Sequence, residues 1–470
     1  MRRPHRPFVA VTLSAAFLGA LAPLAAAQPL FTDALPREEF AARRQAVMAK
    51  IGDGVAVLSG ATERPSYERF RQNNQVFYLT GLEVPRALVM IDGRTKTTTA
   101  FLPPRNERRE RSEGPVLVPG AEAQQLTGIE RVLARDAFAA MLAQAVEEGR
   151  PVYVPFRPEA LGAATEGQVG AHATASFTDP WDGRVSKEAA FMARIRQAHP
   201  AVELRNLDPI VDALRLIKSP REIALVREAT RLACEGILAG MRVAAPGKRE
   251  YEIAAEADRV FAAGGAQGIA YFALVATGAN AHYPHYHHLS SALAADDLVL
   301  FDYAPDYRYY TSDVTRMFPA SGRFTPAKRE LYTVYLRLYQ ALLTSIAPRK
   351  TPSAIVREAV VKMDAYLAQA TIADPRVKAA ADRFVARYRE HNGSMIGHWV
   401  GMEVHDVDTP VDTLQPGMIF TIEPALTIPD DKVYVRIEDV ILITETGYEN
   451  LSATLPVEPA ALEQAMLRKP

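Results

Sequence analysis

Cysteine is almost absent from this 470-residue chain, which has Cys234 and no other. A single cysteine excludes an intrachain disulfide, and the lack of further thiolates disfavours a structural zinc site. Few thiols also suit an oxidising compartment, where a free thiol is a liability. We interpret Cys234 as a small buried side chain on a helix rather than as a nucleophile.

An excess of charge of one sign is lacking too. Lys plus Arg number 54 and Asp plus Glu number 55, which gives a formal net charge of −1. No overall field therefore favours nucleic acid or an anionic membrane surface, and we expect neither as a partner. After the N-terminal region there is no apolar run of about 18 residues, so we expect no membrane-spanning helix in the mature protein. The first half also lacks a Gly-rich phosphate loop and a CxxC pair.

The N-terminus has the pattern of a secretory signal peptide. Basic residues in Met1–Arg6 precede the apolar stretch Val9–Leu24, and Ala25–Ala27 fits a small-residue cleavage site. A resident membrane helix is the competing interpretation, but Pro23 and the alanines favour cleavage. We therefore predict a signal peptide over 1–27 and a periplasmic or secreted protein with no membrane attachment after cleavage.

The chain is too long for one hydrophobic core and predicts two domains with shorter flanking segments. We place the boundary between the domains near Asn206. The expected segments are a tether over 28–36, a smaller α/β domain over 37–205, a catalytic domain over 206–460 and a tail over 461–470.

The first domain shows mixed helix and strand patterns. Short apolar runs bounded by turn residues predict strands, and a longer amphipathic stretch predicts a helix. The charged run 105–113 is typical of a solvated loop. The expected elements are a helix over 40–51 and strands over 54–58, 76–80 and 87–91.

The second domain opens with a strong helix-start signal. Ser219 is a good N-cap, Pro220 occupies the first helical position, and Glu222 completes a capping box. Further helices are expected over 251–263 and from Thr325 onward. With the strand patterns between and after them, they predict an α+β domain in which helices pack on strands.

The stretch from Leu298 to Phe318 carries the first chemical signal. It predicts a buried strand over 298–301, a turn at Pro305-Asp306, and a second β-rich segment over 307–314. This hairpin would bring Asp302 and Asp313 toward each other. Two facing carboxylates in an apolar setting repel unless they share a proton, a cation or a pair of metal ions.

Two further carboxylates end or interrupt β-rich runs. Glu423 follows the strand-like run Met418–Ile422, and Val433–Asp439 alternates apolar with polar residues. Because side chains alternate across a strand, Tyr434, Arg436 and Glu438 would share one face. A surface strand explains that alternation equally well.

Histidines concentrate in the same part of the chain, where seven of the ten fall between His282 and His405. Their combination with the acids suggests metal binding, because four carboxylates balance the charge of two dications. Five oxygen-rich ligands with one imidazole favour manganese, cobalt or zinc over copper. The five candidates are Asp302, Asp313, His398, Glu423 and Glu438.

At these residues the chain resembles a known family, the pita-bread metallopeptidases, in their aminopeptidase P and prolidase branch. The resemblance covers nearly all of the mature chain. It implies an α+β catalytic domain, with helices packed on a curved antiparallel sheet, and a smaller α/β N-terminal domain. The motifs that carry it are Phe70-Arg71-Gln72-Asn73-Asn74, Phe77-Tyr78-Leu79-Thr80-Gly81, Ile217-Lys218-Ser219-Pro220-Arg221-Glu222-Ile223, Ser312-Asp313-Val314-Thr315-Arg316, Val404-His405-Asp406, Pro416-Gly417-Met418, Ile422-Glu423-Pro424 and Arg436-Ile437-Glu438-Asp439.

Matched motif by motif, the resemblance assigns roles to the site residues. Asp313 and Glu438 would bridge two divalent ions, Asp302 would bind one of them, and His398 with Glu423 would bind the other. Glu423 would also shuttle the proton to the leaving nitrogen. The histidines that bind substrate and assist catalysis would be His285 and His405, with Arg436 bracing the site.

The expected function is that of an exported dinuclear aminopeptidase that hydrolyses the N-terminal peptide bond, Xaa-Pro, through a hydroxide bridging the ions. Manganese is the expected metal, with zinc or cobalt as alternatives, and the resemblance implies a peptide substrate and a homodimer or homotetramer. The chain departs from the proline-specific pattern at Ser394, Ala304, Ala425 and Thr427. Alternatives are an Xaa-Pro dipeptidase (prolidase), a metal-free creatinase-like hydrolase and a non-catalytic binding module.

Overall fold

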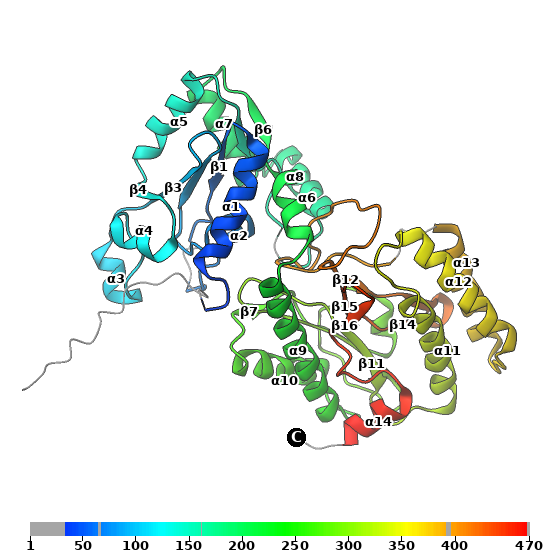
Figure 1. The fold of residues 1–470 in the computed structure, drawn as a ribbon. Helices are drawn as coiled ribbons and strands as arrows, with labels where there is room; N and C mark the ends of the chain where they lie inside the picture. Colours follow the sequence, from blue (N-terminus) through cyan, green and yellow to red (C-terminus); the bar gives the residue numbers. More distant parts are fainter. Residues whose placement is uncertain (1–32, 64–66, 161, 392–395, 468–470) are drawn as a thin grey trace, which may run out of the picture.

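The computed structural model describes residues 33–63, 67–160, 162–391 and 396–467. The expected signal peptide, most of the tether and Ser394 lie outside these residues. Figure 1 shows two bodies: an N-terminal domain coloured blue through cyan to green and a larger C-terminal domain coloured green to red. In the described part of the chain, no helix combines the length and the apolar character needed to cross a bilayer.

The N-terminal domain is built on one mixed six-stranded sheet in the order β4-β3-β2-β1-β5-β6. The strands β1, β2 and β3 pair antiparallel, whereas β4, β5 and β6 join by parallel pairing. The strands are β1 (Val55–Ser59), β2 (Leu88–Asp92), β3 (Thr97–Leu102), β4 (Arg131–Ala134), β5 (Val152–Val154) and β6 (Leu204–Asn206), and the helices are α1 (Arg37–Ile51), α2 (Asn74–Thr80), α3 (Glu107–Glu113), α4 (Ala121–Thr127), α5 (Ala137–Glu147), α6 (Glu166–Thr178) and α7 (Lys187–Ala198).

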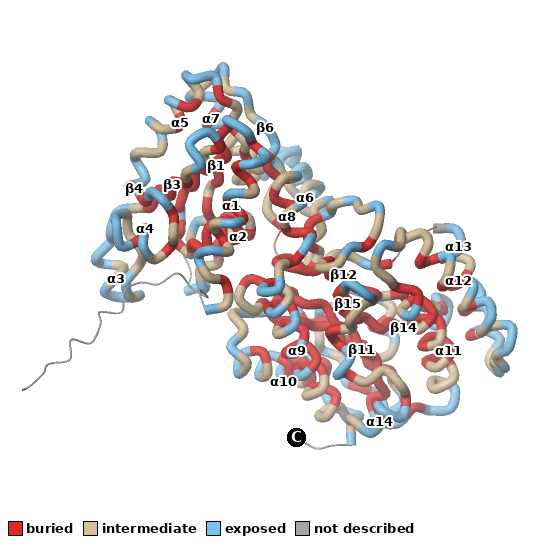
Figure 2. The backbone as a smooth tube through the Cα atoms, viewed as in Figure 1, coloured by how far each residue is buried: buried red, intermediate tan, exposed pale blue. Residues whose placement is uncertain are grey.

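Both faces of this sheet are covered, which explains the nearly continuous apolar sequence of its central strand. Ala56 and Leu58 of β1 face the cluster that contains side chains of α1 and α2, and Val55 and Val57 face the cluster formed with α5 and α7. A strand that is buried on both sides needs apolar residues at every position rather than an alternating pattern. Figure 2 shows the burial that results.

The strand expected over 76–80 is wrong, because these residues form the helix α2. The Asn73 side chain accepts a hydrogen bond from the Val76 backbone nitrogen (2.9 Å) and so caps the helix. Gly81 ends it in the left-handed conformation, with φ of 68°. The run 105–113 is solvated as expected, but its residues from Glu107 onward form α3.

The C-terminal domain packs helices on small antiparallel sheets, ordered β11-β9-β8, β12-β15-β16, β13-β14 and β10-β7. Isolated bridges, Thr315 to Glu438 and Trp399 to Phe420, connect segments of neighbouring sheets. The strands are β7 (Gly268–Ile269), β8 (Leu274–Thr277), β9 (Leu298–Asp302), β10 (Pro305–Asp306), β11 (Thr315–Pro319), β12 (Ile419–Ile422), β13 (Ala425–Ile428), β14 (Val433–Arg436), β15 (Asp439–Ile443) and β16 (Tyr448–Asn450).

The capping box predicted at Ser219 is confirmed, and it starts the 24-residue helix α9. The helix α14 contains most of the segment expected to be a tail, and it packs on α9 as part of the domain. The helices of this domain are α8 (Asp208–Leu216), α9 (Pro220–Val243), α10 (Glu250–Ala263), α11 (Pro326–Leu343), α12 (Pro352–Gln369), α13 (Pro375–His391) and α14 (Pro459–Leu467), with 3-10 turns η1 (Gly278–His282) and η2 (Pro429–Asp431).

One fully buried ion pair holds the layers of the C-terminal domain together. Arg316 on β11 donates to the Asp439 carboxylate (2.6 Å) at the start of β15. The same guanidinium donates to the carbonyl oxygens of Thr315, Glu438 and Leu455. Burial opposes ionisation of Asp439, but Arg316 and two hydroxyl donors outweigh it and lower the pKa of this carboxyl.

The two domains meet through polar and aromatic contacts. The Tyr309 ring stacks on Phe77 of the N-terminal domain, with ring centroids 3.6 Å apart. Arg71, also from the N-terminal domain, lies over the Tyr309 ring, with its Cζ 4.5 Å from the ring centroid. Arg71 also pairs with Asp306 (2.6 Å). Both aromatic burial and a charge-assisted hydrogen bond therefore fix the relative position of the domains.

The carboxylate of Glu159 is half-buried beside this junction. It accepts a hydrogen bond from the backbone nitrogen of Asn74 (2.6 Å), the first residue of α2. Burial raises the pKa of Glu159 to about 7, and the nearby carboxylates of Glu403 and Glu188 act in the same direction. The hydrogen bond from Asn74 and the charge of Arg71 offset part of this rise.

Candidate metal centre

Two carboxylates meet where β9 ends and β11 begins. Asp302 is the last residue of β9 and pairs in register with Thr315, the first residue of β11. Asp313 lies two residues before β11, and the Tyr271 hydroxyl oxygen lies 2.6 Å from one oxygen of each aspartate. The hairpin therefore brings the two acids together as expected. Its second strand begins at Thr315, later than the predicted 307–314 segment, because Tyr307–Tyr310 form a turn closed by an isolated bridge.

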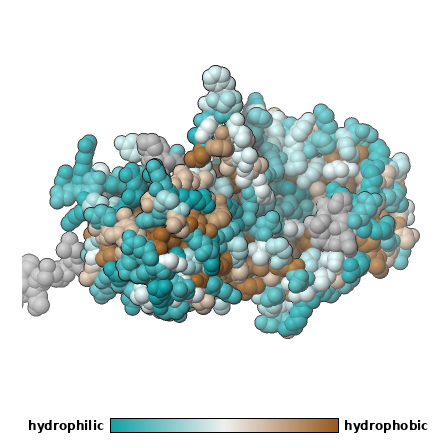
Figure 3. Space-filling view, turned by 90° about the horizontal axis from the view of Figure 1, so that it is seen from above, coloured by the Kyte–Doolittle hydropathy of each residue, from teal (hydrophilic) through white to brown (hydrophobic). Residues whose placement is uncertain are grey.

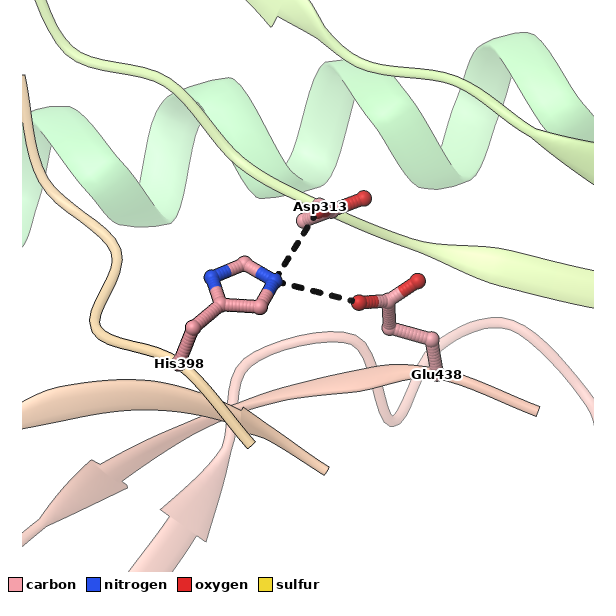
Figure 4. A group of neighbouring side chains, drawn as sticks. All are labelled: Asp313, His398 and Glu438. Atoms are coloured by element: carbon pink, nitrogen blue, oxygen red, sulfur yellow. Dashed lines mark ion pairs between the residues drawn. The ribbon is translucent and has the colours of Figure 1, made fainter. Parts of the chain in front are cut away.

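The imidazole of His398 points into this acidic cluster. Its Nε2 lies 3.4 Å from Asp313 Oδ2, 3.4 Å from Glu423 Oε1 and 3.7 Å from Glu438 Oε1. Figure 4 shows the ring facing the Asp313 and Glu438 carboxylates from a different segment of chain. His398 Nδ1 lies 3.2 Å from the Trp399 carbonyl oxygen. A carbonyl only accepts, so Nδ1 carries a proton toward Trp399 and Nε2 is the ring nitrogen that faces the cluster.

Glycine is required just before this histidine. Gly397 has φ of 150°, and a Cβ at this position would lie 1.8 Å from the Thr421 carbonyl oxygen. The Thr421 backbone nitrogen in turn donates to the His398 carbonyl oxygen (2.8 Å). This close approach of two backbones holds His398 against β12, the strand that leads directly into Glu423.

Glu438 lies at the centre of the cluster. Its side chain is 1% exposed, and Oε2 accepts a hydrogen bond from the Thr315 hydroxyl (2.8 Å). The other oxygen, Oε1, is buried and has no hydrogen-bond partner among the described residues. A buried carboxylate oxygen in that state is costly, and a cation would satisfy it.

Arg436 lies beside the carboxylates from the end of β14. Its Nη2 contacts Asp302 Oδ2, and its Nη1 lies 3.4 Å from Glu423 Oε2. Nη2 is also 4.0 Å from Glu438 Oε2. The predicted single strand is interrupted after Arg436, yet Arg436 and Glu438 still face the same centre.

The pKa values of the cluster are shifted in the direction expected of several carboxylates that share too little positive charge. Burial raises the pKa of Asp302 to about 7, although Arg436 lowers it. Burial and the carboxylates of Asp313 and Glu423 raise the pKa of Glu438 well above its usual range. Burial would lower the pKa of His398, but its carboxylate neighbours outweigh that effect and raise it well above 6.5. Like charges held this close in a buried site call for a cation.

The residues present fit divalent metal ions. Ligand atoms of Asp313, His398 and Glu438 all lie within 4.8 Å of one another. Asp302 joins this group through the shared Tyr271 hydroxyl, and Glu423 joins it through His398. Four hard carboxylates and one imidazole are a donor set that manganese, cobalt and zinc accept.

The two other histidines predicted for the site occupy different environments. The ring of His405 lies beside that of His398, with centroids 4.0 Å apart, and its Nδ1 contacts the Ala163 carbonyl oxygen. Burial and the charge of His398 lower the pKa of His405 to about 4. His285 lies in the exposed loop after η1, and its charge also contributes to the lowered pKa of His405.

Two site residues were missed from the sequence. Thr315 lies in the motif Ser312-Asp313-Val314-Thr315-Arg316, and the predicted hairpin could have indicated that it pairs with Asp302. Tyr271 precedes β8 in a segment without a catalytic pattern, so only the folded chain shows that its hydroxyl connects both aspartates. Of the departures noted in the sequence, Thr427 lies on β13 opposite Tyr434 of β14.

Comparison with known proteins gives the family. The profile of Metallopeptidase family M24 matches residues 224–445, and that of Aminopeptidase P, N-terminal domain, matches residues 40–153. An Xaa-Pro aminopeptidase of Escherichia coli (strain K12) is 30% identical over 455 residues, with 92% of this chain and 98% of the relative covered. The chain belongs to the aminopeptidase P branch of metallopeptidase family M24.

Solved structures agree with this assignment. E. coli aminopeptidase P with the inhibitor Pro-Leu has a TM-score of 0.73 at 28% identity, covering 92% of this chain and 98% of that one. Proline aminopeptidase P II from Yersinia pestis has a TM-score of 0.72 at 29% identity, covering 92% and 99%. The expected pita-bread fold with a separate N-terminal domain is confirmed. This M24 peptidase is a metal-dependent aminopeptidase that acts on peptides.

Proposed function

We propose that this M24 peptidase removes the N-terminal residue from peptides whose second residue is proline, and that it uses two divalent ions. The observation that carries the proposal is the convergence of five ligands, Asp302, Asp313, His398, Glu423 and Glu438, on one buried point. The proline preference is supported by the names of the relatives, several of which are Xaa-Pro aminopeptidases.

By the resemblance to the family, Asp313 and Glu438 would be shared by the two ions, and their ligand atoms lie within 4.8 Å of each other and of His398. Asp302 would complete one site, and His398 with Glu423 the other. When bound, a pair of divalent ions lowers the pKa of water and polarises a peptide carbonyl, which makes hydrolysis possible near neutral pH. Manganese is the metal we propose, with zinc or cobalt as alternatives.

The side chains around the ligands divide the remaining work. Glu423, whose side chain is 29% exposed, is the most accessible carboxylate of the cluster and is placed to carry a proton to the leaving nitrogen. Arg436 balances part of the negative charge of Asp302 and Glu423 and holds both in place. His285 and His405 would bind the substrate.

The contact of His405 with Ala163 refines the role of this histidine. Because a carbonyl only accepts, Nδ1 of His405 carries a proton. With the pKa of the ring lowered to about 4, His405 is neutral at pH 7 and Nε2 is an acceptor. We therefore assign to His405 the binding of an N–H group of the peptide, and to His285 the donation to the developing oxyanion.

The test combines metal content with a peptide panel. We expect protein purified without chelator to hold about two divalent ions per chain and to cleave Xaa-Pro-Xaa peptides far faster than Xaa-Ala-Xaa peptides. Asp313→Asn should lose metal and abolish turnover, whereas Asp382→Asn, at an exposed position on α13, should retain both. Equal cleavage of both peptides would remove the proline preference, and cleavage of dipeptides alone would favour a prolidase. Metal content near zero would favour the creatinase-like or non-catalytic alternatives.

We also propose export and self-association. Export is supported by the leader pattern over 1–27, and N-terminal sequencing of the periplasmic or secreted protein should begin at Gln28. A homodimer or homotetramer is supported by the resemblance to the family, and light scattering on the purified protein measures the mass directly.

Figure 3 shows that one face is mostly hydrophilic, with hydrophobic side chains gathered in smaller areas.

A further inference from the structure

The N-terminal domain supplies none of the five proposed ligands, yet it touches the segment that carries His405. This segment, residues 399–408, is called the histidine loop below. Its Val404 backbone nitrogen lies 3.4 Å from the Gly162 carbonyl oxygen, and His405 Nδ1 contacts the Ala163 carbonyl oxygen. The Asp408 backbone nitrogen donates to Glu166 at the start of α6 (3.1 Å). The loop is therefore fixed from outside the catalytic domain.

Asn74 reaches the same loop from the first turn of α2. This side chain is 1% exposed, and its Nδ2 donates to Glu403 Oε1 (3.0 Å). Arg71 Nη1 donates to Asn74 Oδ1 (2.8 Å), which fixes the orientation of the amide and turns the NH₂ group toward Glu403. The Asn74 backbone is held by Glu159 (2.6 Å). The amide is thus oriented at both ends.

From Glu403 the contacts continue to the residue after His405. Arg215 Nη2 lies 3.3 Å from Glu403 Oε1 and 2.5 Å from Asp406 Oδ1. Lys218 Nζ holds the other oxygen of Asp406 (2.9 Å). All of these side chains are buried, so each charge depends on its partner. The contacts hold the loop on both sides of His405, two residues before it and one residue after it.

We propose that Asn74 is a positioning residue for peptide hydrolysis, which holds His405 in place through Glu403. The inference rests on the proposed role of His405 in substrate binding. Asn74 does not touch the reacting atoms, and its effect reaches them by fixing the backbone of the histidine loop. A displacement of about 1 Å in a group that binds the substrate can cost about 100-fold in rate.

The neighbouring asparagine provides a matched control. Asn73 Oδ1 caps α2 at Val76, and Asn73 Nδ2 donates to the Ser59 carbonyl oxygen (2.9 Å), so both of its bonds stay within the N-terminal domain. Asn73→Ala should lower the thermal midpoint while kcat/KM stays within about two-fold. Asn74→Ala should lower kcat/KM ten- to 100-fold at unchanged metal content, measured well below the thermal midpoint.

A double-mutant cycle separates positioning from general damage. His405→Ala should lower kcat/KM, and adding Asn74→Ala to it should cause little further loss, because the group that Asn74 positions is already gone. Fully multiplicative losses, or wild-type kinetics in Asn74→Ala, would overturn the inference. If Asn74→Ala does not fold, Glu403→Gln in the same cycle tests the same contact from the other side, with the same outcomes.

The proposed function and this inference fail differently. If the wild-type enzyme cleaves no peptide, or if His405→Ala has full activity, the proposed function or the role of His405 is wrong. If the wild-type enzyme is active and His405→Ala is impaired, the behaviour of the Asn74 variants alone decides the inference.

Discussion

The carboxylate of Glu159 gives a stability prediction whose size follows from its burial. Its pKa is raised from the usual 4.5 to about 7, so between these pH values the folded protein binds more protons than the unfolded chain. Stability therefore falls as pH rises from 4.5 to 7 and stays low above it. At about 1.4 kcal/mol per pKa unit, the full loss is about 3 kcal/mol.

Glu159→Gln removes this loss because an amide does not ionise. The Gln oxygen can still accept the hydrogen bond from the Asn74 backbone nitrogen, and the neighbouring charges of Arg71, Lys187, Glu188 and Glu403 are unchanged. We expect the difference in unfolding free energy between the variant and wild type to grow by roughly 2 to 3 kcal/mol in favour of the variant as pH rises from 5 to 8.

The assay is urea unfolding followed by far-UV circular dichroism at pH 5, 6, 7 and 8, with both proteins in the same metal state. Glu147→Gln, an exposed position on α5 of the same domain, should track wild type across this range. A constant difference between wild type and Glu159→Gln at all four pH values would show that burial does not raise this pKa, and the reasoning would be refuted.

Three further outcomes are expected. Chelation with EDTA should abolish peptide cleavage and lower the thermal midpoint, because the buried carboxylates around His398 lose their cations; activity that survives metal removal would contradict the site. Arg316→Met should lower the unfolding free energy by about 3 to 5 kcal/mol in urea, since it leaves Asp439 buried without its partner. The exposed Arg231→Met should change it by less than about 1 kcal/mol. Iodoacetamide should leave Cys234 unmodified by mass spectrometry until the protein unfolds, because burial raises the pKa of this thiol to about 11.

Local signals predicted part of the fold well. Ser219, Pro220 and Glu222 determine the start of α9 through contacts within four residues, so the sequence alone suffices. The segment Val76–Thr80 has a strand-like composition, but its helix depends on the cap at Asn73 and on burial against α1. A short apolar run fits either state, and only the surrounding structure decides between them.

The candidate site was predictable to the extent that its residues end strands. Asp302 and Glu423 directly follow apolar runs, and the hairpin between Asp302 and Asp313 could be expected from turn residues. Tyr271 could not be found in this way, because its contact with both aspartates depends on how β8 and β9 pack. The hydrogen bond from Asn74 to Glu403 joins residues 329 positions apart, and it depends on how the two domains dock.

The stack of Phe77 on Tyr309 bears on any attempt to divide the polypeptide. A catalytic domain expressed alone would lack Phe77, the ring that covers Tyr309, and Arg71, the partner of Asp306. An apolar ring and an unpaired carboxylate would then both be exposed to water. Such a fragment should aggregate rather than yield a smaller working enzyme. Engineering a minimal catalyst from this scaffold would first require a redesign of the surface at which the two domains meet.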